Sequence, residues 1–161
     1  MGITAGDDIL ASHFKGTRYY TIHPSDFFKD WEYIAPEISA NFVRSSSDTA
    51  PVKVHAPIHL PNGATITSLK LYWFRNDAAA SGQAKLLRLR LVDTNVYELA
   101  AANSDSSAGH HEVEDTTINE PIVDNTNYAY FLELLIAPND AKGDVYAKGA
   151  VITYSVDYPL P

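Results

Sequence analysis

Apolar and polar residues alternate with a period of two along most of the chain, in short runs separated by turn residues. This pattern is typical of β-strands that have one face in a core and the other in solvent. About eight such runs occur, at spacings near ten residues, over 17–23, 52–60, 66–75, 84–92, 96–101, 112–118, 128–136 and 145–158. Helical periodicity is almost absent. The sequence therefore predicts an all-β fold, an antiparallel β-sandwich of jelly-roll type.

The alternation also predicts which side chains face the core. In the run 52–60 the apolar residues share one face, while Lys53, His55 and His59 share the other. Pro57 has no N–H to donate, so this strand is expected at a sheet edge or at a bulge. Asn62-Gly63 is the strongest short hairpin signal in the chain.

Two further strands carry specific expectations. In the run 84–92 we expect Leu87, Leu89 and Leu91 to face inward, with Arg88 and Arg90 on the opposite face. The run 128–136 (YAYFLELLI) is the most apolar and is predicted to be central. Glu133 interrupts it, so this carboxylate is expected to face solvent or a subunit contact.

Two segments do not fit the strand pattern. Asp7 or Asp8 can cap a short helical turn through Phe14, so residues 1–16 are predicted to form a docking or oligomerisation segment. Residues 17–161 are predicted to form a single sandwich domain. Within it, residues 24–47 form a long irregular connection that carries Trp31 and Tyr33, and such a connection is expected to pack as an Ω-type loop or to meet a partner.

Composition and charge limit the partners and the location. Twelve Lys and Arg oppose 20 Asp and Glu, and the formal charge of −8 argues against binding to nucleic acid or to an anionic membrane. No apolar run approaches the length of a membrane span, so we expect no membrane insertion. The first residues lack the basic region of a signal peptide, so an extracellular or virion location would be reached without one.

The residues that could carry a metal or a catalytic step form no strong pattern. His110, Glu112 and Glu114 share one face of a strand, but three alternate strand residues rarely meet one ion, so we favour a solvated strand edge. The carboxylates of Asp124, Asp140 and Asp144 are oxygen ligands of the kind that calcium takes, yet turn chemistry explains them better. No metal and no cofactor are expected.

Catalysis has no positive residue to support it. Cysteine is absent. Neither a Gly-x-Ser-x-Gly elbow nor a Gly-rich phosphate loop occurs. The carboxylates Glu98, Glu120 and Glu133 are not paired by any spacing that glycoside hydrolysis requires. We therefore expect the protein not to be an enzyme.

The aromatic residues carry more information, because the chain has ten Tyr, six Phe and two Trp. For Trp73, Phe131 and Tyr154 we favour core packing. The aromatic residues that could present a flat face to a ligand are Trp31, Tyr72 and Tyr128.

Residues 4–14 (TAGDDILASHF) resemble the short N-terminal module of many bacteriophage tail-fibre and related surface proteins. In those proteins Ala-Gly-Asp, an apolar pair and Ala-Ser precede the fibre or a receptor-facing domain, and an Asn often stands where this chain has Lys15. The stretches APIHLPNGATITSLKLYW and VDNTNYAYFLEL are similar to uncharacterised β-rich proteins of bacteria and their viruses. The resemblance implies a structural role on a virion or cell surface, in a homotrimer or a higher assembly.

Three functions follow, in this order. The first is a non-enzymatic structural or attachment protein of a phage virion or cell-surface assembly, which contacts itself and other virion or surface proteins. Its subunit contacts would come from Ile9, Leu10, Phe14, Trp31 and Tyr33. The second is a carbohydrate-binding module of jelly-roll type that uses exposed aromatic residues. The third is a small glycan- or ester-directed hydrolase with acidic residues such as Asp124, Asp140 or Glu133 in its site.

Overall fold

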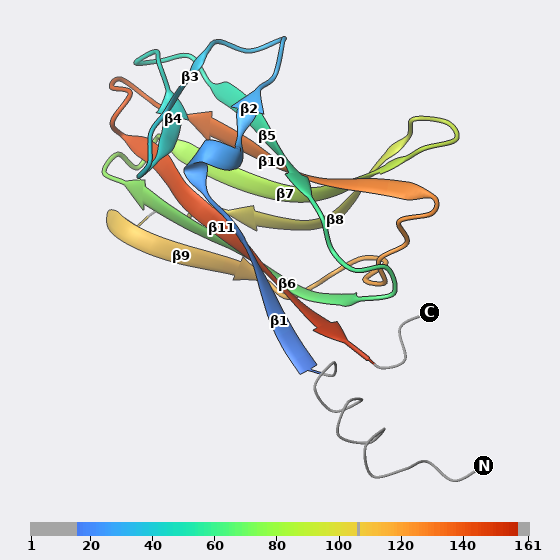
Figure 1. Cartoon of the computed structure of the whole chain (residues 1–161). Coiled ribbons are helices and arrows are strands. Elements are labelled where there is room, and N and C mark those ends of the chain that lie inside the picture. Colours follow the sequence, from blue (N-terminus) through green and yellow to red (C-terminus); the bar gives the residue numbers. More distant parts are fainter. Residues whose placement is uncertain (1–15, 106, 158–161) are drawn as a thin grey trace, which may run out of the picture.

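Two antiparallel β-sheets pack face to face in the computed structural model, which describes residues 16–105 and 107–157 (Figure 1). The six-stranded sheet has the order β3-β4-β11-β6-β9, and β1 also pairs with β11. Its strands are β1 (Gly16–Ile22), β3 (Pro36–Ile38), β4 (Val43–Ser45), β6 (Thr65–Arg75), β9 (Gly109–Asp115) and β11 (Val145–Val156).

The five-stranded sheet has the order β2-β5-β10-β7-β8. Its strands are β2 (Phe28–Lys29), β5 (Val52–Ile58), β7 (Ser81–Arg90), β8 (Val96–Asn103) and β10 (Tyr128–Ala137). A short 3-10 turn, η1 (Pro24–Asp26), connects the first two strands. Within the described residues, no helix is long and apolar enough to cross a bilayer.

The predicted fold class, an all-β jelly-roll sandwich, is confirmed. The described part of the chain has eleven strands rather than about eight, because the connection 24–47 contributes the short strands β2, β3 and β4. The predicted helical turn through residues 7–14 lies outside the described residues.

One core lies between the sheets, and it is built from alternate residues of the long strands. Trp73 of β6 is 1% exposed, and Leu132 and Leu134 of β10 are fully buried. Removing each such side chain from water contributes roughly 1.5–3 kcal/mol. The predicted inward face of the run 52–60 is confirmed, since its apolar residues are all buried, and β10 is central as expected.

The predicted orientation of the run 84–92 is wrong. Leu86, not Leu87, faces the core and pairs with Leu132, while Leu87 pairs with Phe131 on the outer face. Arg88 instead lies on the inner side, at the end of the sandwich. Because Leu86 and Leu87 are adjacent, the alternation in the sequence allows either leucine to face the core. The pairing register between β7 and β8 also shifts between these two residues.

Asn62-Gly63 forms a turn, but not the predicted hairpin. The Ala64 N–H donates to the Pro61 carbonyl oxygen at 3.1 Å, and Gly63 has a φ of 78°. The turn carries the chain from β5 in one sheet to β6 in the other. β2 pairs with Val54 and His55 of β5, and Pro57 lies outside this pairing. The missing N–H of Pro57 therefore breaks no hydrogen bond between β2 and β5.

Gly149 has a backbone position that no other residue fits. It has a φ of 131°, follows a register shift between β11 and β6, and would place a Cβ 2.6 Å from the Ile22 carbonyl oxygen of β1. The close approach of β1 to β11 therefore requires glycine at this position.

We expect Gly149→Ala to lower the free energy of unfolding by about 2–4 kcal/mol, because backbone strain and a clash with β1 add. Gly16→Ala is the matched control, since Gly16 has a φ of 129° but no atom within 4 Å of the added Cβ. The difference between the free energies of unfolding of the two variants, measured by urea denaturation, gives the cost of the clash apart from the cost of backbone strain. Equal stability of the two variants would contradict the argument.

Candidate functional site

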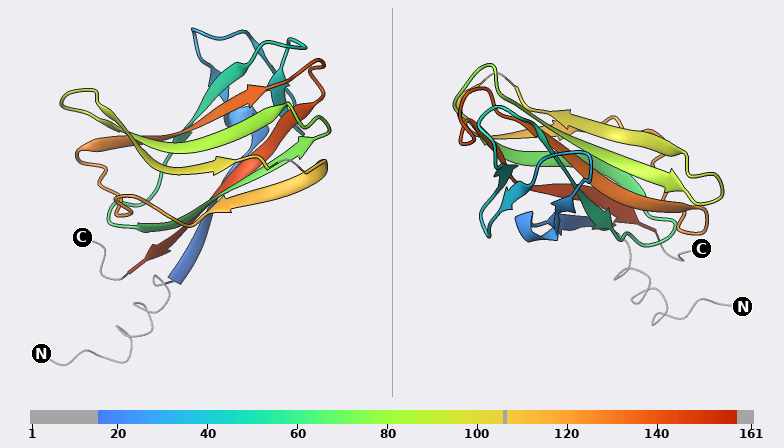
Figure 2. Two further views of the ribbon diagram at one scale, coloured as in Figure 1. Left: turned by 180° about the vertical axis from the view of Figure 1, so that it is seen from behind. Right: turned by 90° about the horizontal axis from the view of Figure 1, so that it is seen from above.

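The outer face of the five-stranded sheet is curved. In the left view of Figure 2, β7 is bowed, with its middle lower than its two ends, so the upper, outer side of this sheet is the concave one. The segment that carries β2, β3 and β4 rises at one end, and the β7–β8 hairpin rises at the other. We call the outward side chains of this sheet the concave face.

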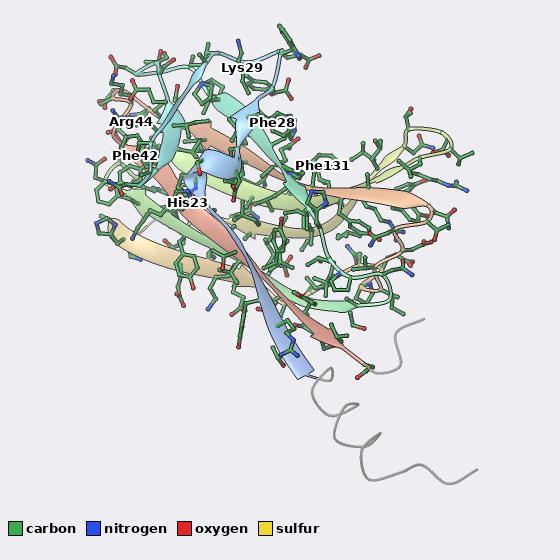
Figure 3. All side chains as sticks on the ribbon, viewed as in Figure 1. His23, Phe28, Lys29, Phe42, Arg44 and Phe131 are labelled. Atoms are coloured by element: carbon green, nitrogen blue, oxygen red, sulfur yellow. The ribbon has the colours of Figure 1, made fainter. Side chains whose placement is uncertain are left out.

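Three adjacent strands each place an aromatic ring on the concave face. Phe28 of β2 lies 6.1 Å from the His55 ring of β5, and His55 lies 5.5 Å, edge to face, from Phe131 of β10. Figure 3 shows Phe28 and Phe131 on the two sides of β5. Phe28 is 55% exposed, so a ring at one end of this row is open to a ligand.

Charged groups lie directly beside the aromatic row. The Glu133 carboxylate lies 3.2 Å from His55 Nε2 and 3.5 Å from Lys53 Nζ. Because an ionised carboxylate only accepts hydrogen bonds, His55 Nε2 is the donor in this pair. Asp30 approaches the same nitrogen at 3.8 Å.

The charges of the concave face largely neutralise one another. Farther along the face, Lys85 Nζ of β7 pairs with Glu98 of β8 at 2.9 Å. Burial opposes the charged form of Lys53, but Glu133, Tyr33 and Asp30 outweigh it and raise the pKa of Lys53 above its usual value. The face thus offers aromatic rings, acceptors and donors without a large excess of either sign.

Trp31 and Tyr33, the two predicted aromatic residues of the long connection, lie at the rim of this face. Trp31 is 95% exposed, in the turn that follows β2. Tyr33 is half-buried, and Lys53 Nζ lies 5.0 Å from the centre of its ring. Their predicted role in subunit contacts stays a prediction, and Ile9, Leu10 and Phe14 lie outside the described residues.

The other predicted ligand-binding aromatic residues lie elsewhere. Tyr72 is on the outer face of the six-stranded sheet. Tyr128 is half-buried near the end of the sandwich, where the Arg88 guanidinium lies 4.1 Å from the centre of its ring. The concave face does not include either tyrosine.

The weak metal candidates His110, Glu112 and Glu114 alternate on the outer side of β9. His110 packs against Phe74, with ring centroids 4.9 Å apart, while Glu112 and Glu114 pair with Lys70. Among the described residues, the His, Asp and Glu side chains close enough to share an ion are Asp77, Asp140 and Asp144. The structure therefore does not gather the predicted trio.

Asp77, Asp140 and Asp144 have hydrogen bonds that explain their proximity. Asp144 Oδ2 accepts from the N–H groups of Asp140 and Ala141, and Asp77 Oδ1 accepts from the Ala79 N–H. The Asp144 carboxylate raises the pKa of Asp140. Asp124 lies in another turn, where it accepts from Thr126. Backbone N–H groups of the turns thus donate to the carboxylates of Asp77, Asp124 and Asp144.

Sequence reasoning missed Phe28 and placed Phe131 in the core. The sequence does contain a signal for Phe131. Residues two apart on a strand share a face, so Phe131 lies on the same face as Glu133, which was expected to face outward. No comparable signal existed for Phe28, since β2 has only two residues.

The contribution of Asp144 to the stability of the protein depends on pH. It is almost fully buried; burial raises its pKa, but hydrogen bonds from the Ala141 and Asp140 N–H groups outweigh this and lower it overall. Its stabilising contribution is therefore complete above the unfolded value near 4 and is lost as the pH falls through the lower folded value.

We expect Asp144→Ala to reduce the free energy of unfolding at pH 7 by about 1–3 kcal/mol, because two enclosed N–H groups lose their acceptor. Asp144→Asn keeps an acceptor oxygen and should lose less. Denaturation from pH 7 to pH 2 should show the deficit of the alanine variant shrinking below about pH 4. A deficit that grows on acidification would refute this role.

Comparisons with known proteins bear on the fold. No family model matches the sequence, and no curated protein matches it significantly. Among solved structures, a xylan-binding module, CBM15, has a TM-score of 0.57 at 12% identity, over 88% of this chain and 99% of that chain. The C-terminal CBM6 of LamC, a laminarinase from Zobellia galactanivorans, has a TM-score of 0.52 at 12% identity, over 84% and 99%.

A third similar structure is the xylanase Xyn10B of Clostridium thermocellum, with CBM22-1 and GH10 modules in complex with xylohexaose. Its TM-score is 0.51 at 10% identity, over 92% of this chain and 30% of that chain. At these identities the likeness shows a shared jelly-roll fold.

Proposed function

We propose that this protein is a carbohydrate-binding module that holds a glycan chain on the concave face. The observation that carries the proposal is the row of Phe28, His55 and Phe131, one ring from each of three adjacent strands, with charged groups beside it. The fold shared with CBM15 and CBM6 modules supports it as an analogy, because one fold can host many functions.

The chemistry of the face fits a sugar. A pyranose ring has an apolar C–H surface that packs on an aromatic face and hydroxyl groups at its edge that both donate and accept. Beside the ring of Phe131, Glu133 supplies acceptor oxygens and Lys53 supplies donors. Hydrogen bonds to charged groups contribute about 1.5–3 kcal/mol each, more than neutral ones.

The same arrangement argues for binding rather than hydrolysis. The Glu133 carboxylate is held by His55 and Lys53, and Glu98 is held by Lys85. Glycoside hydrolysis needs two carboxyl groups that act as a pair on one bond. Asp30 and Glu133 both lie against His55 Nε2, at 3.8 and 3.2 Å, and Lys53 also pairs with Glu133, so both carboxylates are engaged by neighbouring side chains, an arrangement that suits recognition of hydroxyl groups.

Phe131→Ala should weaken glycan binding about tenfold or more, because a stacking surface at the centre of the face is removed. Trp31→Ala, at the exposed rim, should weaken the binding of long chains more than that of short ones. Binding can be followed by isothermal titration with xylohexaose, soluble xylan and laminarin, after a glycan array has identified the preferred chain.

Phe42→Ala is the matched control for Phe131→Ala. Phe42 is likewise half-buried, but it packs against Tyr146 on the six-stranded sheet, so its removal should leave affinity unchanged. The proposal fails if the array gives no saturable glycan binding, or if Phe131→Ala and Phe42→Ala bind equally well.

A further inference from the structure

A groove of about 620 Å³ lies on the outer face of the six-stranded sheet. Ten residues line it, from β1, β6, β11, the end of β9 and the position after it: Tyr19, Thr21, Thr67, Ser68, Lys70, Tyr72, Glu114, Thr116, Val151 and Thr153. None of these strands belongs to the five-stranded sheet, so the groove and the concave face lie on opposite sides of the sandwich (Figure 1). We call it the tyrosine groove.

Tyr72 presents an open ring side to this groove. Its pairing partner on β11 is Gly149, which has no side chain and cannot be replaced by a larger residue without meeting β1. A second hollow of about 310 Å³ continues past this position and shares Thr21, Tyr72 and Val151 with the first. The glycine that lets β1 approach β11 therefore also leaves Tyr72 uncovered.

Tyr19 forms the other aromatic part of the groove and is 70% exposed. It pairs with Thr153 of β11, which pairs with Ser68 of β6, four residues before Tyr72. The two tyrosines are therefore roughly 13 Å apart along the strands and about 10 Å apart across them. A single sugar cannot reach both positions, whereas an oligosaccharide can.

The polar lining fits an uncharged ligand. Five of the lining residues carry aliphatic hydroxyl groups that can donate and accept, namely Thr21, Thr67, Ser68, Thr116 and Thr153. The cation of the tyrosine groove, Lys70, pairs with Glu112 at 3.2 Å and Glu114 at 3.6 Å. Two carboxylates lie around this ammonium and Lys148 lines the adjoining hollow, so the charges beside the groove balance and an uncharged ligand meets no excess of either sign.

We propose that the tyrosine groove is a second glycan-binding site, specific for uncharged oligosaccharides and separate from the concave face. A chain that binds glycans on two opposite faces is bivalent. It can link two polysaccharide chains, and its avidity for an insoluble glycan exceeds the affinity of either site.

The test uses the full chain in a background where the concave face is disabled by Phe131→Ala. Titration with xylohexaose and with the neutral oligosaccharides selected on the array should still show one weak site. Adding Tyr72→Ala or Tyr19→Ala should weaken that residual binding about tenfold or more. Tyr72→Phe keeps the ring and should retain most of the affinity, and polygalacturonate should not bind.

Tyr146→Ala is the matched control, because Tyr146 is a half-buried tyrosine on the same sheet outside the groove lining. Thermal unfolding shows whether each variant is folded, and the highly exposed Tyr19 gives a variant that leaves the core intact. Backbone amide shifts of β1 and β11 on titration should follow the residual binding.

The outcomes separate the two proposals. Loss of all glycan binding on Phe131→Ala alone, with no effect of the tyrosine substitutions, overturns the second site and leaves the first. Residual binding that only the tyrosine substitutions remove supports the second site. Loss of binding on the tyrosine substitutions but not on Phe131→Ala supports the groove and refutes the concave face. Absence of any glycan binding by the wild-type chain refutes both.

Discussion

The alternation of side chains along β10 is the constraint on which the rest of the structure depends. This strand lies in the middle of the five-stranded sheet, so its neighbours β5 and β7 take their register from it. Leu132 and Leu134 enter the core between the sheets, and the pleat then forces Phe131 and Glu133 onto the outer face. A one-residue slip would bury Glu133 and expose Leu132, Leu134 and Ile136, a cost large enough to fix the register. The composition of the concave face thus follows from core packing.

The sequence alone predicts the sandwich and much of its core, because long strands repeat the same signal many times. The run 52–60 is an example, where five buried apolar residues agree on one face. Prediction fails where the signal is short or degenerate. The adjacent leucines 86 and 87 fit either phase, and only the pairing of Leu86 with Leu132 decides between them. Strand β2 is two residues long, and what places Phe28 on the concave face is its pairing with His55, a contact between residues remote in sequence.

The candidate site likewise combines residues that stand out in the sequence with contacts that only the fold creates. Glu133 and Trp31 are unusual in the sequence itself, one as a charge in an apolar strand and the other as an aromatic residue in an irregular segment. The proximity of Glu133 to His55 and Lys53 is a product of strand order, which no local pattern encodes. The tyrosine groove is harder still to predict, since it depends on a glycine on β11 lying opposite Tyr72 on β6.

Within residues 16–105 and 107–157 no α-helix covers either sheet, so both outer faces of the sandwich are available, and strands hold their side chains in fixed relative positions. A ligand that binds such a face orders little of the protein, so the entropic cost of association stays low. The charges on the concave face are already paired within it, so the free protein does not carry strongly solvated single charges that a sugar would have to desolvate. The hydroxyl groups of a sugar can then bind to the remaining carboxylate lone pairs and ammonium protons without breaking these ion pairs. Paired charges beside exposed rings are therefore better suited to a neutral, polyhydroxylated chain than to a charged partner.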